Sequence, residues 1–159
     1  MATKSIYYGY TLRTPNSPYQ QWALSQLPIP VTAMFTSTTT TEVGAGDIIP
    51  ITSCALNQVG GTVNTDGTFS LPAGMYKIKF ITLVTGTTVA EVALTAGSTT
   101  VLNSSSTVSG TLPTTVQGEV ILSCSGCNVK WSLVNSSENS ETPQMMGMYS
   151  VQVIIERLL

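Results

Sequence analysis

The chain has 159 residues, a formal net charge of −2 and charged side chains at only 9% of its positions. An average soluble domain carries about 25% charged residues, so hydroxyl-bearing side chains must cover much of this surface. Six Lys and Arg residues are spread along the chain and form no basic stripe that could neutralise a phosphate backbone. The composition therefore argues against nucleic-acid binding, and the weak charge favours association between molecules.

The sequence also offers few of the side chains that enzymes use for catalysis, because it contains no histidine. This removes the commonest general base, the Ser-His-Asp triads and most zinc sites. The carboxylates that come nearest to forming pairs are Glu138 with Glu141 and Glu91 with Glu119, and neither pair matches an acid–base setting. No calcium-loop motif is present. We therefore expect no enzymatic activity, no cofactor and no metal.

Targeting signals are also missing from the sequence. The first residues lack the apolar core of a signal peptide, and no run approaches the roughly 20 apolar residues of a membrane span. We expect a protein without a membrane span and with reduced cysteines.

Residues 1 to 30 differ from the rest because aromatic residues and prolines are concentrated there. The prolines argue against a long helix or a central strand, while the aromatic area is too large to leave comfortably in water. This arm either packs on its own domain or inserts into a neighbouring protein as an anchor. The candidate anchor residues are Tyr7, Tyr8, Tyr10, Tyr19 and Trp22.

From residue 31 onward, short alternating or β-branched runs are separated by turn residues such as Asp66-Gly67 and Ser109-Gly110. The pattern predicts an all-β domain over residues 31 to 159. We predict ten strands, at 31–36, 47–53, 59–64, 67–71, 75–84, 87–94, 98–103, 115–124, 127–134 and 147–158.

Two segments supply the candidate core or subunit-interface residues. In FSLPAGMYKIKF, residues 69 to 80, Pro72 and Gly74 predict a tight turn between two strands. Alternation then places Lys77 and Lys79 on the face opposite the apolar residues. The last segment, MYSVQVIIERLL, predicts a strand that closes a sheet centrally. The candidates are Phe69, Tyr76, Ile78, Phe80, Tyr149, Val151 and Val153.

Three further features have more than one interpretation. Cys124-Ser-Gly-Cys127 suits the two ends of a hairpin turn, with a hairpin disulfide or a metal site as alternatives. Residues 135 to 144, NSSENSETPQ, predict an exposed loop. The methionines that follow predict either core packing or a subunit contact; they are Met145, Met146 and Met148.

The order of these segments resembles the tumour necrosis factor and complement globular-head superfamily, in its microbial or viral branch. The resemblance lies in the segment Gly46-Asp47-Ile48-Ile49-Pro50, in the polar hairpin that follows it and in the terminal strand. It also lies in a signature that consists of a phenylalanine, a short turn with a proline, and Gly-x-Tyr at the start of a long strand. The signature residues are Phe69, Pro72, Gly74 and Tyr76. The resemblance covers residues 31 to 159 and implies a ten-stranded jelly-roll β-sandwich that forms a homotrimer by burying one sheet between subunits. It leaves open which face is buried.

Two functional hypotheses follow. The first is a non-enzymatic structural protein, a trimeric component of a virus or phage particle that is assembled in the host cytoplasm, located in the virion and held to other capsid proteins by its arm. The second is a trimeric receptor- or glycan-binding head on a microbial cell or spore surface, with loops 103–113 and 135–146 carrying the specificity. A pentamer and an arm swapped between subunits are further alternatives.

Overall fold

The structure is a computed structural model that describes residues 6–8, 11–13, 31–86, 88–108 and 112–159, and it divides into two units between residues 30 and 31. In the first unit, β1 (Ile6–Tyr8) pairs antiparallel with β2 (Thr11–Arg13). A two-stranded hairpin this short is at best marginally stable in water.

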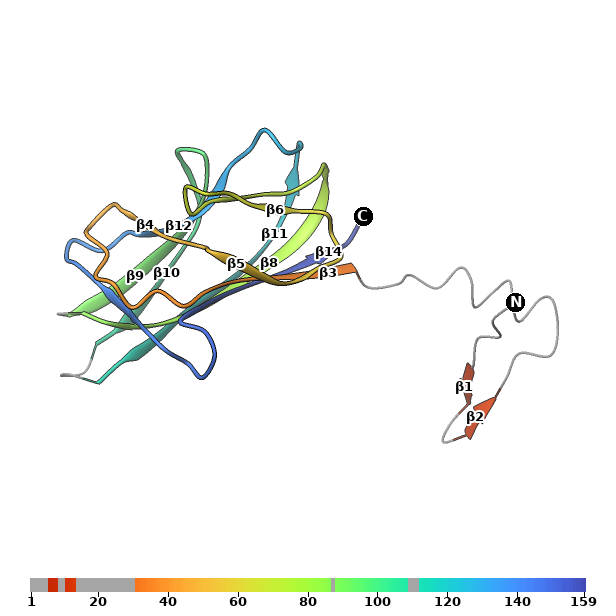
Figure 1. Cartoon of the computed structure of the whole chain (residues 1–159), viewed down its shortest axis with the longest axis horizontal. Helices are drawn as coiled ribbons and strands as arrows, with labels where there is room; N and C mark the ends of the chain where they lie inside the picture. Colours follow the sequence, from red (N-terminus) through yellow and green to blue (C-terminus); the bar gives the residue numbers. More distant parts are fainter. Residues whose placement is uncertain (1–5, 9–10, 14–30, 87, 109–111) are drawn as a thin grey trace. The chain divides into compact units, whose positions relative to one another are not determined.

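The second unit is a sandwich of two six-stranded antiparallel sheets (Figure 1). The first sheet has the order β11-β8-β14-β3-β5, with β13 also paired to β8. Its strands are β3 (Val31–Ser37), β5 (Ser53–Asn57), β8 (Gly74–Thr85), β11 (Thr114–Cys124), β13 (Thr142–Gln144) and β14 (Val151–Arg157). As predicted, the last strand lies centrally, between β8 and β3.

The second sheet has the order β10-β9-β12-β7-β6, with β4 also paired to β12. Its strands are β4 (Ile48–Ile49), β6 (Thr62–Val63), β7 (Phe69–Ser70), β9 (Val89–Ala96), β10 (Thr99–Thr107) and β12 (Trp131–Asn135). The predicted all-β jelly-roll sandwich is confirmed. In the described part of the chain, no helix is long and apolar enough to span a membrane.

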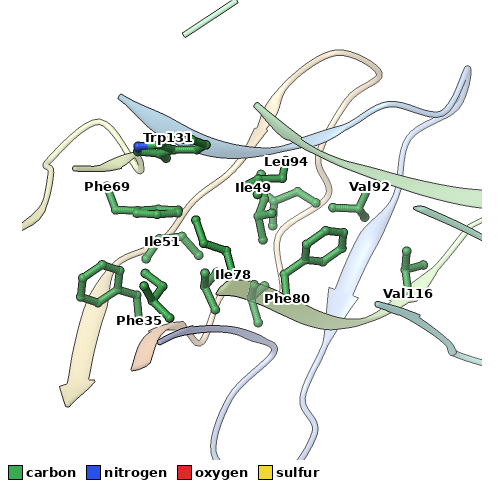
Figure 2. Close-up of a cluster of buried hydrophobic side chains, with 14 of the residues drawn as sticks. Phe35, Ile49, Ile51, Phe69, Ile78, Phe80, Val92, Leu94, Val116 and Trp131 are labelled. Carbon is green, nitrogen blue, oxygen red and sulfur yellow. The ribbon is translucent and has the colours of Figure 1, made fainter. Parts of the chain in front are cut away.

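The core fills the space between the sheets with alternate residues of each strand. On β8, Tyr76, Ile78 and Phe80 are fully buried, while Lys77 and Lys79 point to the other face. Figure 2 shows aromatic side chains from both sheets, Phe35 from the first and Phe69 and Trp131 from the second, gathered in one part of the core. There the rings of Phe35 and Phe69 meet edge to face, with centroids 5.5 Å apart, a geometry that adds to simple area burial.

The sheets come close enough at Gly118 of β11 to leave no room for a side chain. A Cβ at this position would lie 2.5 Å from Ser104 Oγ, 2.7 Å from Leu102 Cδ2 and 2.9 Å from Phe80 Cε1. Gly118 therefore lets β11 and β10 approach each other across the edge of the sandwich.

The predicted strand at 47–53 is divided between the two sheets. Ile48 and Ile49 pair with β12 in the second sheet, whereas Ser53 begins β5, which pairs with β3 in the first. Between them, Pro50 has no N–H to donate to a ladder. The chain therefore crosses from one sheet to the other here, with Ile49 and Ile51 fully buried on either side of the proline.

The predicted exposed loop at 135–144 is wrong in part. Asn135, Ser137 and Glu141 are buried, and residues 142–144 form β13 against β8. Asn135 explains the inward fold of this segment, because its Nδ2 donates to the carbonyls of Val43 and Asn139, both at 2.9 Å. A polar composition gave no sign of these long-range contacts.

We expect Tyr76→Asp to prevent folding. Tyr76 is fully buried and its hydroxyl donates to the Pro72 carbonyl at 2.9 Å. A carboxylate there would be unpaired in the core, which is costly against a total stability of about 5 to 15 kcal/mol. Tyr76→Phe, which loses only the hydrogen bond, should fold and lose about 0.5–1.5 kcal/mol in urea unfolding. A native-like Tyr76→Asp variant would refute the assigned core position.

Candidate functional site

The candidate site is the outward face of the first sheet, the side turned away from the core. Alternation along β8 places Ile81 and Leu83 on this face, and Ile154 of β14 and Met34 of β3 continue it across the sheet. These four side chains are half-buried although no protein layer covers them among the described residues. Leu56 and Ile121 are 42% and 61% exposed. We call the set outward-face residues: Met34, Leu56, Ile81, Leu83, Ile121 and Ile154.

The strand register groups these side chains into rows. One row runs across four strands in the order Met34, Ile154, Lys79 and Glu119, each residue being the cross-strand neighbour of the next. In the next row Glu156 lies opposite Lys77, and their charged atoms are 3.5 Å apart. The face is therefore apolar with a few charges at its centre and at the β11 edge.

The outward face of the second sheet has a different chemistry. Its outward positions carry short polar side chains such as Ser105 and Thr107 of β10. The hydroxyls of Thr95 and Ser132 bond to each other at 2.7 Å, and Ser136 Oγ donates to Asn103 Oδ1 at 2.7 Å. Hydroxyls and amides satisfy one another at these positions, although Ala93, Val134 and the 39% exposed Ile48 form an aliphatic row across the same face. The outward face of the second sheet is therefore the more polar of the two, and the outward-face residues of the first sheet better suit a protein partner.

A cavity of about 260 Å³ lies at the loop end of the sandwich. It is lined by Thr88, Val89, Glu91, Ser137, Glu138 and Asn139. The lining mixes carboxylates, hydroxyls and an amide with one aliphatic side chain, which is the chemistry of a small polar ligand site. Among the described residues no group of three or more acidic or cysteine side chains is spaced to hold a metal ion.

Glu141 lies close to this cavity and is only 1% exposed. Its Oε1 accepts the backbone N–H of Glu91 at 2.6 Å, whereas its Oε2 is buried without a partner among the described residues. Burial raises the pKa of the Glu141 carboxyl, the hydrogen bond from Glu91 N–H and the nearby Ser137 hydroxyl oppose this shift, and the Glu91 charge adds to it. The carboxyl therefore favours its protonated form more than an exposed glutamate does.

All the residues predicted as core or interface except Tyr149 lie on the inner side of the sandwich. Phe69, Tyr76, Ile78, Phe80, Val151 and Val153 are buried between the sheets. Tyr149 is half-buried before β14, where it bridges to Met146. The described part of the arm includes only the backbone of Tyr7 and Tyr8 among the anchor candidates; Tyr10, Tyr19 and Trp22 lie outside the described residues.

Sequence reasoning missed the outward-face residues of β3 and β14. The signal was available, because Met34 and Ile154 have the opposite parity to buried Phe35 and Val153. A strand with apolar residues on both parities has two faces to cover. By contrast, Met145 and Met148 lie in the loop before β14 and are 42% and 75% exposed.

The cysteines form no disulfide: Cys54, Cys124 and Cys127 are all free thiols. Cys124 is buried and its Sγ donates to the Leu71 carbonyl at 3.5 Å, whereas Cys127 is exposed. Cys124 ends β11, whereas Cys127 lies inside a turn in which the Val129 N–H donates to the Gly126 carbonyl at 3.2 Å. The predicted hairpin turn is wrong, because β11 and β12 belong to different sheets.

Comparison with known proteins identifies the fold. No protein-family model and no curated protein matches the chain. Among solved structures, it is similar to Eiger TNF from S. frugiperda, with a TM-score of 0.68, 13% identity and coverage of 83% of this chain and 94% of that one. The chain has the jelly-roll fold of the tumour necrosis factor and complement globular-head superfamily, which confirms the predicted resemblance at the level of fold.

Two other solved structures show how widely this fold is distributed. The globular domain of zebrafish complement 1qA protein matches with a TM-score of 0.55 and 13% identity, covering 80% of this chain and 95% of that one. The PRD1 vertex protein P5 matches with a TM-score of 0.50 and 14% identity, covering 82% and 96%.

We expect Glu141→Gln to flatten the pH dependence of stability. The folded-state pKa of Glu141 is raised above its ordinary value of 4.5. The contribution of this carboxyl to the free energy of unfolding is therefore fully present below pH 4.5 and is lost as the pH rises through the folded-state pKa. The amide keeps an acceptor for Glu91 N–H without an ionisable group. Thermal unfolding between pH 4 and 8 should show a higher relative stability of the variant at the alkaline end. Glu138→Gln, an exposed change in the same loop, should leave the profile unchanged; identical profiles for all three proteins would contradict the assignment.

Proposed function

We propose that this protein is a non-enzymatic structural protein, a homotrimeric jelly-roll component of a virus or phage particle. The observation that carries the proposal is the outward face of the first sheet, where no described residue covers the large aliphatic side chains, whereas the outward face of the second sheet is more polar. Such a difference favours burial of the first face between copies. The similarity in fold to the PRD1 vertex protein P5 supports the link to a virion.

The aromatic arm would attach this trimer to the particle. Its β1–β2 hairpin is too short to be stable alone, which favours a role that includes a docking surface. Tyrosine and tryptophan side chains are well suited to such a surface, because they combine large apolar area with a polar group. The partner in this proposal is another capsid protein, and the location is the virion.

A second candidate function is a receptor- or glycan-binding head on a microbial cell or spore surface. The cavity beside residues 137–139 favours it, because these three lining residues belong to one of the loops predicted to carry specificity. Both functions use the same trimer and differ in what the loop end contacts.

We expect Leu83→Asp to convert the trimer into a folded monomer. The cross-strand neighbours of Leu83 are the uncharged Thr115 and Gln144. A carboxylate at this position of the outward face would therefore be desolvated without a partner in the assembly, yet it would be exposed in the free subunit. Light scattering should give one times 16.8 kDa for the variant and three times for the wild type. Ser105→Asp, on the outward face of the other sheet, should remain trimeric. A mass of five subunits for the wild type would replace the trimer with a pentamer.

We expect deletion of residues 1 to 30 to separate attachment from assembly. The truncated protein should remain a trimer by light scattering, because the outward face belongs to the second unit. It should fail to be incorporated into particles in a co-sedimentation assay with the wild-type protein as reference. Incorporation without the arm would refute the anchor, and a monomeric truncated protein would show that the arm itself holds the subunits together.

A further inference from the structure

The outward face carries two lysines and two glutamates, and only one pair of them is joined. Lys77 and Glu156 neutralise each other between β8 and β14 at 3.5 Å. Lys79 forms no ion pair with a described residue, although Glu119 is its cross-strand neighbour. The face is therefore neutral as a whole, and it retains one positive and one negative charge without an ion-pair partner in the described part of the chain.

These two charges occupy different places on the sheet. Lys79 lies on β8, one strand inward from the β11 edge, with Ile154 beside it and Ile81 two residues further along the same face. Glu119 is exposed and lies on β11, which is an edge strand. If another protein surface covers the centre of this face, the Lys79 ammonium loses its water and requires a carboxylate.

The other cationic side chains of the second unit are already engaged. Lys130 pairs with Asp66 at 2.6 Å, and Arg157 donates to the carbonyls of Ala73 and Leu159. Among the described strands of the first sheet, the remaining acidic side chain on the outward face is Glu119. Complementary charge thus selects Glu119 of another copy as the partner of Lys79.

The geometry of a ring of subunits indicates which edge of the sheet meets the outward face of the next subunit. In a closed ring of three identical subunits the contacts are heterologous, so one patch meets a different patch on the next subunit. The first sheet has two edges, β11 and β5, and β5 carries the uncharged sequence SCALN. The β11 edge is therefore the one whose charge matches the centre of a neighbouring face.

We propose that Glu119 of each subunit pairs with Lys79 of the next, so that three identical ion pairs fix the register of the ring. The inference rests on the proposed trimer and adds to it the contact that decides which edge meets which face. The partner surface is the β11 edge of a second copy of this chain.

Charge reversal tests the pairing. Lys79→Glu and Glu119→Lys should each weaken the trimer by about tenfold or more at low ionic strength, because like charges then face each other between subunits. The double reversal should restore the trimer in sedimentation measurements. Lys130→Glu, which removes a cation from a loop and not from this face, should leave the assembly constant unchanged. Trimers of equal strength in both single variants would overturn the inference.

Zero-length crosslinking of the unmodified protein separates pairing between subunits from pairing within one. Chains labelled with ¹⁴N and ¹⁵N are mixed, co-refolded and treated with a carbodiimide, which joins an ammonium to a contacting carboxylate. The 79–119 crosslink should appear in mixed-isotope peptide pairs, whereas the 77–156 crosslink should appear only between peptides of the same label and serves as the internal control. A 79–119 crosslink confined to one label in a trimeric protein would overturn the pairing alone. A monomeric wild-type protein would overturn the proposed trimer as well.

Discussion

The strict alternation of β8 is the constraint on which the rest of the structure depends. Over twelve residues this strand sends every second side chain into the core and the others to the outward face. It pairs with β11, β14 and β13, so a shift of one residue would reverse the faces of its own side chains and break three registers together. The same alternation thus determines both the fully buried aromatic core and the surface available to another copy.

The outward faces of the two sheets differ in chemistry although the protein carries few charges. On the second sheet, hydroxyls and amides bond to one another and leave few unsatisfied groups, as in the Thr95–Ser132 pair. On the first sheet, aliphatic side chains alternate with a few charges that define position more than they add affinity. With so few charges in the chain, each one on a contact surface has a large influence on which arrangement is favoured.

The part of the fold that could be predicted from the sequence is the part set by local patterns. The alternation of residues 75 to 80 and the central terminal strand follow from parity, and the structure has both. The tight turn predicted at Pro72 and Gly74 is instead a crossing from β7 in the second sheet to β8 in the first, with Gly74 as the first residue of β8. The change of sheet at Pro50 was missed, because a run of β-branched residues does not show where its hydrogen-bond partners change. Burial of Glu141 was missed for a similar reason: its neighbours in the sequence are polar, and its contacts with Val43 and Glu91 come from distant segments.

The pairing of Val31 with Arg157 places the start and the end of the head at the same end of the sandwich. Arg157 lies opposite Tyr76 of β8, whereas Thr142 pairs with Thr85 near the other end of that strand, roughly 30 Å away at the usual rise of a strand. A fluorescent label or fused domain after Leu159 would therefore sit beside the point where the arm joins the head, while an epitope inserted at residues 138–140 would be displayed at the far end. The two ends can be modified independently, which makes the head a natural display scaffold.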